Sequence, residues 1–179
     1  MPLSIGILST HPPTQCDLVV GRTHPKVLEH HGEAYREGLV QRAAALGVQD
    51  LLRFDDSYRT VEDLSDLAMT ADVVLLPYDS RDQVTSGVVA AVAAGRPVVS
   101  TAFPHAVDLL ADELGLVVPQ TDAVALEDAL RRVLSEAGLA ESMAAKAADR
   151  APDLLRSAVA RQHRGLAGTP VTAVCAAAP

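Results

Sequence analysis

The sequence has 179 residues, of which 49% are apolar, and its formal net charge is −8 at pH 7. This length can bury one hydrophobic core and is too short for two ordinary domains, so we expect one globular unit. Lys and Arg are spread singly along an acidic chain, which argues against nucleic acid as a partner. No apolar run approaches the roughly 18 residues of a membrane span, and the first residues do not resemble a signal peptide. We therefore expect a cytoplasmic protein without a transmembrane segment.

The residues that commonly bind metals are poorly placed to do so. Cys16 and Cys175 lie near opposite ends of the chain, and we expect both to be free thiols. His30 and His31 are adjacent, so on a helix they would point about 100° apart and could not hold one metal together. The sequence predicts no metal site.

Short apolar runs alternate with helical patterns along most of the chain. The first apolar run covers residues 18–20 and is followed by helical spacing over residues 33–46. The next covers residues 51–54, before a helix that opens with a capping signature at Thr60 and Asp63. Further on we expect strands at 72–77, 97–100 and 116–118, and helices at 86–94, 106–114 and 124–136.

Strands that alternate with helices of about 10 to 15 residues are typical of parallel sheets with right-handed crossovers. We therefore predict the α/β class, with a Rossmann-like open parallel sheet and helices on both faces, over residues 18–136. Residues 137–164 should form a helical extension, which Pro152 could interrupt, and residues 165–179 a flexible tail.

A polar turn follows the buried run at residues 72–77. Ligands of open parallel sheets bind beyond the carboxyl ends of the strands, where helix amino ends present free N–H groups. Thr85, Ser86 and Gly87 fall at such a place. Gly87 would let the backbone approach an anion, and Thr85 or Ser86 could cap the helix and offer a hydroxyl. The triplet would also serve as an ordinary helix start, and the spacing alone leaves both readings open.

Other polar residues are weaker candidates for a binding site. His24 and His105 each follow a predicted strand, where a histidine could meet a ligand or simply lie in a solvated loop or at a helix start. Glu33 and Arg36 are three residues apart on one predicted helix, and we expect a surface ion pair.

Three segments resemble the carboxyl-terminal, donor-binding domain of the retaining family-four glycosyltransferases: VVGRTHPKVLEHHGEAYREGL, ADVVLLPYDSRDQVTSGVVAAVAAGRPVVST and HAVDLLADELGLVVP. The resemblance covers about residues 18–134 and implies one half of a GT-B fold. It implies transfer of a glycosyl group from a nucleotide-sugar, with no metal or other cofactor. In that family the turn before the small-residue helix cradles the diphosphate. The implied nucleotide-sugar site comprises Tyr78, Asp82, Gln83, Thr85, Ser86, Gly87, Thr23 and His24.

The sequence departs from the family pattern at one pair of positions. The family commonly carries two glutamates separated by seven residues, and those places hold Asp82 and Ala90. Ala90 cannot accept a hydrogen bond from a ribose hydroxyl. The resemblance therefore assigns no catalytic residue.

The amino end resembles a different part of the family. Residues 5–16, IGILSTHPPTQC, look like the first strand and loop of the acceptor-binding domain, yet the donor-domain pattern follows at once. The resemblance implies an internal deletion between about Cys16 and Asp17, leaving residues 1–17 as a remnant. The deletion would remove most of the acceptor domain and the donor domain's first strand and helix, with the Arg and Lys that neutralise the leaving diphosphate. We predict that residues 5–8 form a strand in the sheet beside residues 18–20 and 72–77, because the gap would otherwise expose a sheet edge.

Three functions remain open from the sequence. The chain could be a glycosyltransferase donor domain with weak or no activity by itself. It could also be a non-catalytic nucleotide-binding or structural remnant. An unrelated small-ligand or phospho-acceptor module is disfavoured, because the acidic cluster that such a module needs at its strand ends is missing. The sequence does not predict the oligomeric state.

Overall fold

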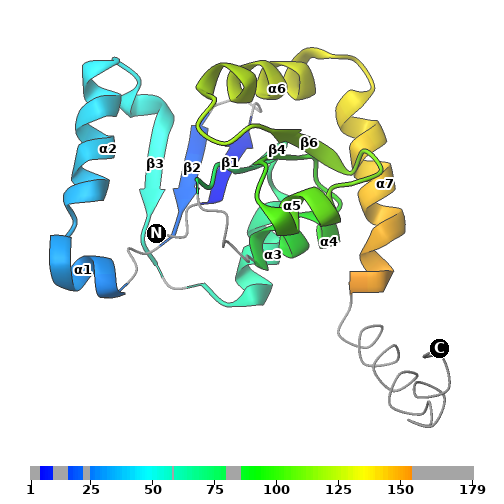
Figure 1. Ribbon diagram of the computed structural model, residues 1–179, viewed down its shortest axis with the longest axis horizontal. Helices are drawn as coiled ribbons and strands as arrows, with labels where there is room; N and C mark the ends of the chain where they lie inside the picture. The colour runs from blue at the N-terminus through cyan, green and yellow to red at the C-terminus, as the bar shows by residue number, and fades with distance from the viewer. Residues whose placement is uncertain (1–4, 10–15, 22–24, 58, 80–85, 155–179) are drawn as a thin grey trace, which may run out of the picture.

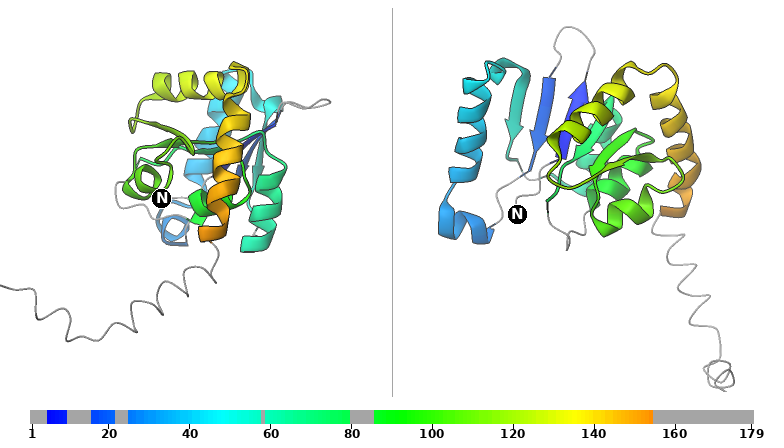
Figure 2. Two further views of the ribbon diagram at one scale, coloured as in Figure 1. Left: turned by 90° about the vertical axis from the view of Figure 1, so that its right-hand side faces the viewer. Right: turned by 45° about the horizontal axis from the view of Figure 1, so that its top comes forward.

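A six-stranded sheet forms the centre of the computed structural model, which describes residues 5–9, 16–21, 25–57, 59–79 and 86–154. The strand order is β3-β2-β1-β4-β5-β6. Helix α6 covers one face of the sheet, and α3, α4 and α5 cover the other (Figure 1, Figure 2). The predicted α/β class is confirmed. No helix among the described residues is both long enough and apolar enough to cross a membrane.

The elements follow one another in the predicted alternation. In chain order they are β1 (Ile5–Ser9), β2 (Cys16–Val20), α1 (Pro25–His31), α2 (Ala34–Ala45), a 3₁₀ turn (Gln49–Leu51), β3 (Leu52–Asp55), α3 (Val61–Met69), β4 (Val73–Leu76), α4 (Ser86–Ala93), β5 (Val98–Thr101), α5 (Pro104–Leu109), β6 (Gly115–Val118), α6 (Ala123–Ser135) and α7 (Leu139–Leu154).

Strand β1 lies in the middle of the sheet and runs against its neighbours. It pairs antiparallel with both β2 and β4, so that Leu8 stands opposite Asp17 on one side and Val73 on the other. The predicted strand at residues 5–8 is thus confirmed. The other five strands run parallel, as predicted. The reversal of β1 follows from its link to β2, residues 10–15, because a parallel crossover needs about a dozen residues or more.

Several helix boundaries differ from the predicted ones. Helix α1 was not predicted, and α5 begins at Pro104 and ends at Leu109, whereas the sequence favoured residues 106–114. Proline suits the first helical position because its missing N–H would have no partner there. Asp112 and Glu113 have φ angles of 59° and 64°, which no α-helix contains.

The capping signature of α3 forms as predicted, whereas the break proposed for α7 does not. The Thr60 hydroxyl accepts from the Asp63 N–H, and the Asp63 carboxylate accepts from the Thr60 N–H. Helix α7 continues through Pro152 to Leu154. The tail predicted for residues 165–179 lies outside the described residues.

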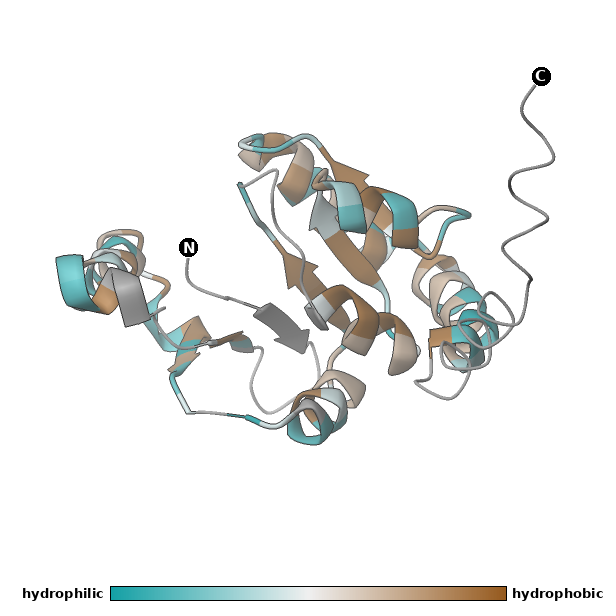
Figure 3. Cartoon of the chain, turned by 60° about the horizontal axis from the view of Figure 1, so that its bottom comes forward, coloured by the Kyte–Doolittle hydropathy of each residue, from teal (hydrophilic) through white to brown (hydrophobic). Residues whose placement is uncertain are grey.

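Two hydrophobic clusters hold the strands, one on each face of the sheet. On one face, Leu76 packs with residues of α4 such as Val88 and Val92. On the other face, Val73 packs with Val133 of α6. Figure 3 shows the most hydrophobic colours along β4, β5, β6 and α4. Because these strands are covered on both faces, their carboxyl ends have fixed positions.

Asp17 is a half-buried carboxylate on β2, next to β1 and β3. Burial raises its pKa to about 6 from the ordinary value of 3.8. The folded chain therefore binds a proton that the unfolded chain releases between about pH 4 and pH 6, and stability falls as pH rises through that window. We expect Asp17→Asn to stabilise the chain at pH 7 by about 1 to 2 kcal/mol, measured by urea unfolding.

The pH dependence provides the control for this prediction. Asp17→Asn should flatten the loss of stability between pH 4 and pH 6, whereas the exposed Asp56→Asn should leave it unchanged. An Asp17→Asn variant that keeps the parent's slope would contradict the assignment.

Candidate functional site

The carboxyl ends of β2 to β6 and the amino end of α4 meet at one edge of the sheet. In open α/β sheets this edge is where ligands bind. Its described residues come from the ends of β4, β5 and β6 and from the first turn of α4. A second group comes from the ends of β2 and β3.

The chain leaving β4 is held by side chains of β5 and of the segment after β6. Tyr78 donates its N–H back to Leu76, and its carbonyl accepts from the Thr101 hydroxyl. The Gln120 amide lies 3.5 Å from the same carbonyl. The Tyr78 ring meets the buried Phe103 ring edge to face, with centroids 5.4 Å apart. The Tyr78 side chain is therefore part of the core, and only 6% of the residue is exposed.

Helix α4 begins at Ser86 with its amino end at this edge. Gly87 is buried in the first turn, and the small residues after it, such as Ala91, pack against the core. The confirmed start at Ser86 places two candidate residues, Ser86 and Gly87, at a helix amino end. The other candidates in this turn, Asp82, Gln83 and Thr85, lie outside the described residues.

Charged side chains, Asp55, Arg36 and Arg59, gather at the ends of β2 and β3. Gly21 donates its N–H to the Asp55 carbonyl, and the Gly21 carbonyl accepts from the Arg36 guanidinium. Hydrogen bonds from Ser57 and Arg59 hold the pKa of the Asp55 carboxyl well below its usual range. The sequence-predicted candidates here, Thr23 and His24, lie outside the described residues.

Two further sequence expectations can be compared with the structure. Glu33 and Arg36 form an ion pair of 3.6 Å, as predicted. His105 is the second residue of α5 and is half-buried, and its Nδ1 has no hydrogen-bond partner among the described residues. The part of the chain that the structure describes holds no group of three His, Cys, Asp or Glu residues arranged for a metal ion.

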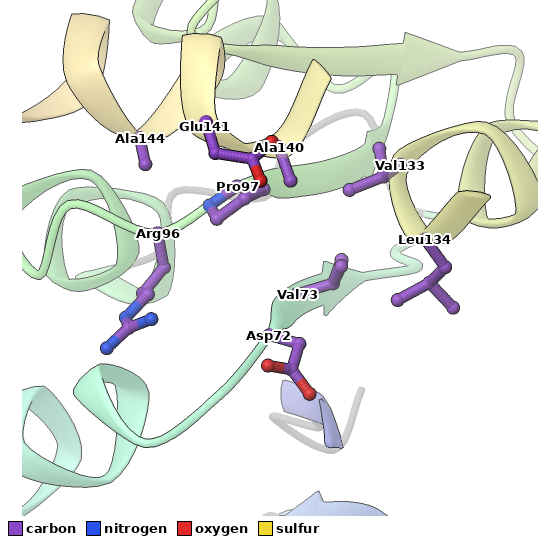
Figure 4. Close-up of a pocket in the computed structure, with 9 residues that line it drawn as sticks. All are labelled: Asp72, Val73, Arg96, Pro97, Val133, Leu134, Ala140, Glu141 and Ala144. Carbon is purple, nitrogen blue, oxygen red and sulfur yellow. The ribbon is translucent and has the colours of Figure 1, made fainter. Parts of the chain in front are cut away.

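A cavity of about 270 Å³ lies at the opposite edge of the sheet, where β4 and β5 begin. Residues of α6 and α7 close it, among them Leu134 and Ala144. Figure 4 shows that the charged groups of Asp72, Arg96 and Glu141 point in different directions and do not converge on one point. The Arg96 guanidinium donates a hydrogen bond to the Met69 carbonyl. The cavity therefore lacks a set of polar groups that could orient a ligand.

Three residues of the site edge were missed by the sequence analysis: Thr101, Gln120 and Arg59. Each depends on a contact between segments far apart in the chain or on a charge partner at a strand end. Thr101 alone carried a usable signal, because Ser100 and Thr101 are polar residues that close a buried apolar strand. The described residues therefore show how the strand ends are held in place, whereas most of the predicted ligand contacts lie outside them.

Solved structures that share the fold of this chain include two glycosyltransferase-type enzymes. Sucrose-phosphate synthase from Thermosynechococcus elongatus is similar over 90% of this chain and 39% of its own, at 25% sequence identity and a TM-score of 0.67. WaaG, a glycosyltransferase involved in lipopolysaccharide biosynthesis, is similar over 75% of this chain and 33% of its own, at 25% identity and a TM-score of 0.60. The chain thus spans well under half of each enzyme.

The sequence itself was also compared with known proteins and with protein families. No curated protein matched the sequence. The model of the glycosyl transferases group 1 family matches residues 17–136, which include β2 from its second residue, all of β3 to β6, and the first turn of α4. This match confirms the glycosyltransferase resemblance on which the predicted site rests. The chain belongs to the group 1 glycosyl transferases.

Proposed function

We propose that this chain is the donor-binding part of a glycosyltransferase and binds a nucleotide-sugar through its diphosphate. The observation that carries the proposal is the start of α4 at Ser86, with the buried Gly87 next, at the carboxyl edge of a parallel sheet. The N–H groups at the amino end of a helix and the helix dipole favour an anion at such a place. Family membership supports a nucleotide-sugar over other anions.

The remaining contacts of the proposed site come from neighbouring segments. Asp82, Gln83 and Thr85 precede α4, and Thr23 and His24 follow β2. We propose that these residues surround the diphosphate and the rest of the donor. Tyr78 contributes through its backbone, because its ring packs against Phe103. No metal ion is needed where N–H groups and a helix end neutralise the phosphates.

Transfer needs more than donor binding. A transferase must orient an acceptor against the donor and stabilise the charge of the leaving diphosphate. The six-residue link between β1 and β2 leaves no room for the crossover helix that follows the first strand of a Rossmann-like half. We therefore propose that the chain alone binds a nucleotide-sugar weakly and transfers no sugar, the internal deletion having removed the acceptor wall.

The reversed β1 also favours the second candidate function, a structural remnant that binds no nucleotide. Calorimetric titration with UDP, GDP and their sugars separates the two. A saturable heat with any of these compounds supports donor binding, and its absence with all of them supports the remnant. Release of free nucleoside diphosphate from a nucleotide-sugar in the presence of acceptor would show that the chain alone is an enzyme.

We expect Gly87→Ala to weaken binding of a nucleoside diphosphate by about tenfold or more. Helical Cβ atoms tilt toward the amino end, so the added methyl group would stand where the diphosphate approaches the N–H groups. Loss of one or two hydrogen bonds to a charged group is worth about this much. Isothermal titration calorimetry with the wild type and the variant measures the ratio.

Gly38→Ala is the matched control. A methyl group at Gly38, in the middle of α2, would have no neighbour within 4 Å, so the same chemical change should leave affinity unchanged. Equal affinities for Gly87→Ala and the wild type would move the diphosphate away from this helix end. A thermal melt of each variant shows whether the buried position at Gly87 tolerates the methyl group.

A further inference from the structure

The backbone leaving β4 breaks the pattern of the sheet at a defined point. The ladder between β4 and β5 ends at Leu76 and Ser100. Beyond it, Pro77 has no N–H to donate, and the Tyr78 N–H turns back to the Leu76 carbonyl. The regular β4–β5 ladder therefore ends before Tyr78, and buried carbonyls beyond the end of a ladder are nearly always satisfied by other donors.

Two adjacent hydroxyls of β5 contact the chain where it leaves β4. The Ser100 hydroxyl lies 3.3 Å from the Leu76 carbonyl, and the Thr101 hydroxyl donates to the Tyr78 carbonyl. Ser100 and Thr101 are the buried polar residues among those the structure describes. The Thr101 hydroxyl also lies 3.3 Å from the Leu76 carbonyl, so both hydroxyls contact the end of β4. The contact with the Tyr78 carbonyl, beyond the strand, comes from Thr101.

We propose that Thr101 is a positioning residue for the donor site, acting through the Tyr78 carbonyl. This inference rests on the proposed function. The Thr101 hydroxyl fixes where the chain leaves the sheet, and the edge-to-face contact of Tyr78 with Phe103 fixes its direction. The first turn of α4 is separated from Tyr78 by only seven residues. A shift at Tyr78 therefore alters the approach to the N–H groups of Ser86 and Gly87.

The test compares three variants with the wild type by titration with UDP and GDP and by thermal unfolding. Thr101→Val keeps the shape of the side chain and removes the hydroxyl, so affinity should fall about fivefold to tenfold. Thr101→Ser restores the hydroxyl and should restore affinity. Ser100→Ala removes the neighbouring buried hydroxyl, which does not touch Tyr78. It should lower the unfolding temperature and leave affinity unchanged.

The outcomes separate this inference from the proposed function. If the wild type binds neither nucleotide, both are overturned. If the wild type binds and Thr101→Val binds equally well, only the positioning role is overturned. Should Thr101→Val fail to fold, Gln120→Leu removes the other side chain near the Tyr78 carbonyl from a half-buried position. It should weaken binding about twofold, and unchanged affinity in that folded variant would overturn the proposal.

Discussion

Ile7→Pro is expected to abolish the cooperative unfolding transition of the chain, or to lower its stability by more than about 3 kcal/mol. Strand β1 has a neighbour on both sides, with Ile7 opposite Leu18 of β2 and Val74 of β4. Proline removes a donor and cannot be accommodated in the middle of a sheet. Urea unfolding followed by circular dichroism measures the effect.

A proline at a permitted position provides the control. Ala123 is the first residue of α6 and is exposed, so Ala123→Pro should change stability by less than about 1 kcal/mol. Ile7→Val keeps a β-branched residue in the strand and should fold as the wild type does. If Ile7→Pro unfolds at the same urea concentration as Ala123→Pro, β1 does not hold the sheet together.

Phe103→Ala should cost about 3 to 5 kcal/mol of stability. The Phe103 side chain is fully buried beside the candidate site, and its ring supports that of Tyr78. The cost combines the lost transfer free energy of the ring with the cavity that remains. Urea unfolding at pH 7 gives the difference in free energy between the two proteins.

Val107 supplies the comparison, on the helix that begins directly after Phe103. It is 48% exposed, and Val107→Ala should cost less than about 0.5 to 1 kcal/mol. Phe103→Leu, which fills part of the space, should fall between the two. A cost for Phe103→Ala close to that for Val107→Ala would mean that the ring is not packed as described.

The sequence predicted the strands far better than the direction of β1. Apolar runs bounded by Gly, Pro and Asp mark buried strands whatever their orientation. Direction depends on the length of the connection and on which strands become neighbours. The six residues between Ser9 and Cys16 do exclude a crossover, so the reversal was in principle readable from the sequence.

The errors at α5 and α7 have a different origin. Proline at residue 104 was a helix-start signal, but the apolar pattern pointed to a later start. In α7, proline inside the helix was outweighed by packing, since Met143 and Ala147 are buried. Local propensity is a weak prior that tertiary contacts override.

The candidate site shows the same limit. Ser86 and Gly87 were predictable because a strand end and a helix start are both local patterns. The hydrogen bond between Thr101 and Tyr78 joins residues that the sequence keeps apart, and nothing local predicts which carbonyl a hydroxyl will reach. The position of the site in the fold could therefore be predicted from the sequence, whereas the hydrogen bonds that support it could not.

The reversed strand has a consequence for the order of folding. The β1–β2 hairpin closes a short loop, which takes microseconds, whereas β1 and β4 are far apart in the chain and pair at a larger entropic cost. Within the described sheet, β2 and β3 connect to β4, β5 and β6 through the β1–β4 ladder, and Val20 of β2 also packs in the cluster that contains Leu76. We expect opening of the ladder, with loss of this packing, to leave each half with its own strand pairs, so that native-state hydrogen exchange shows two foldons.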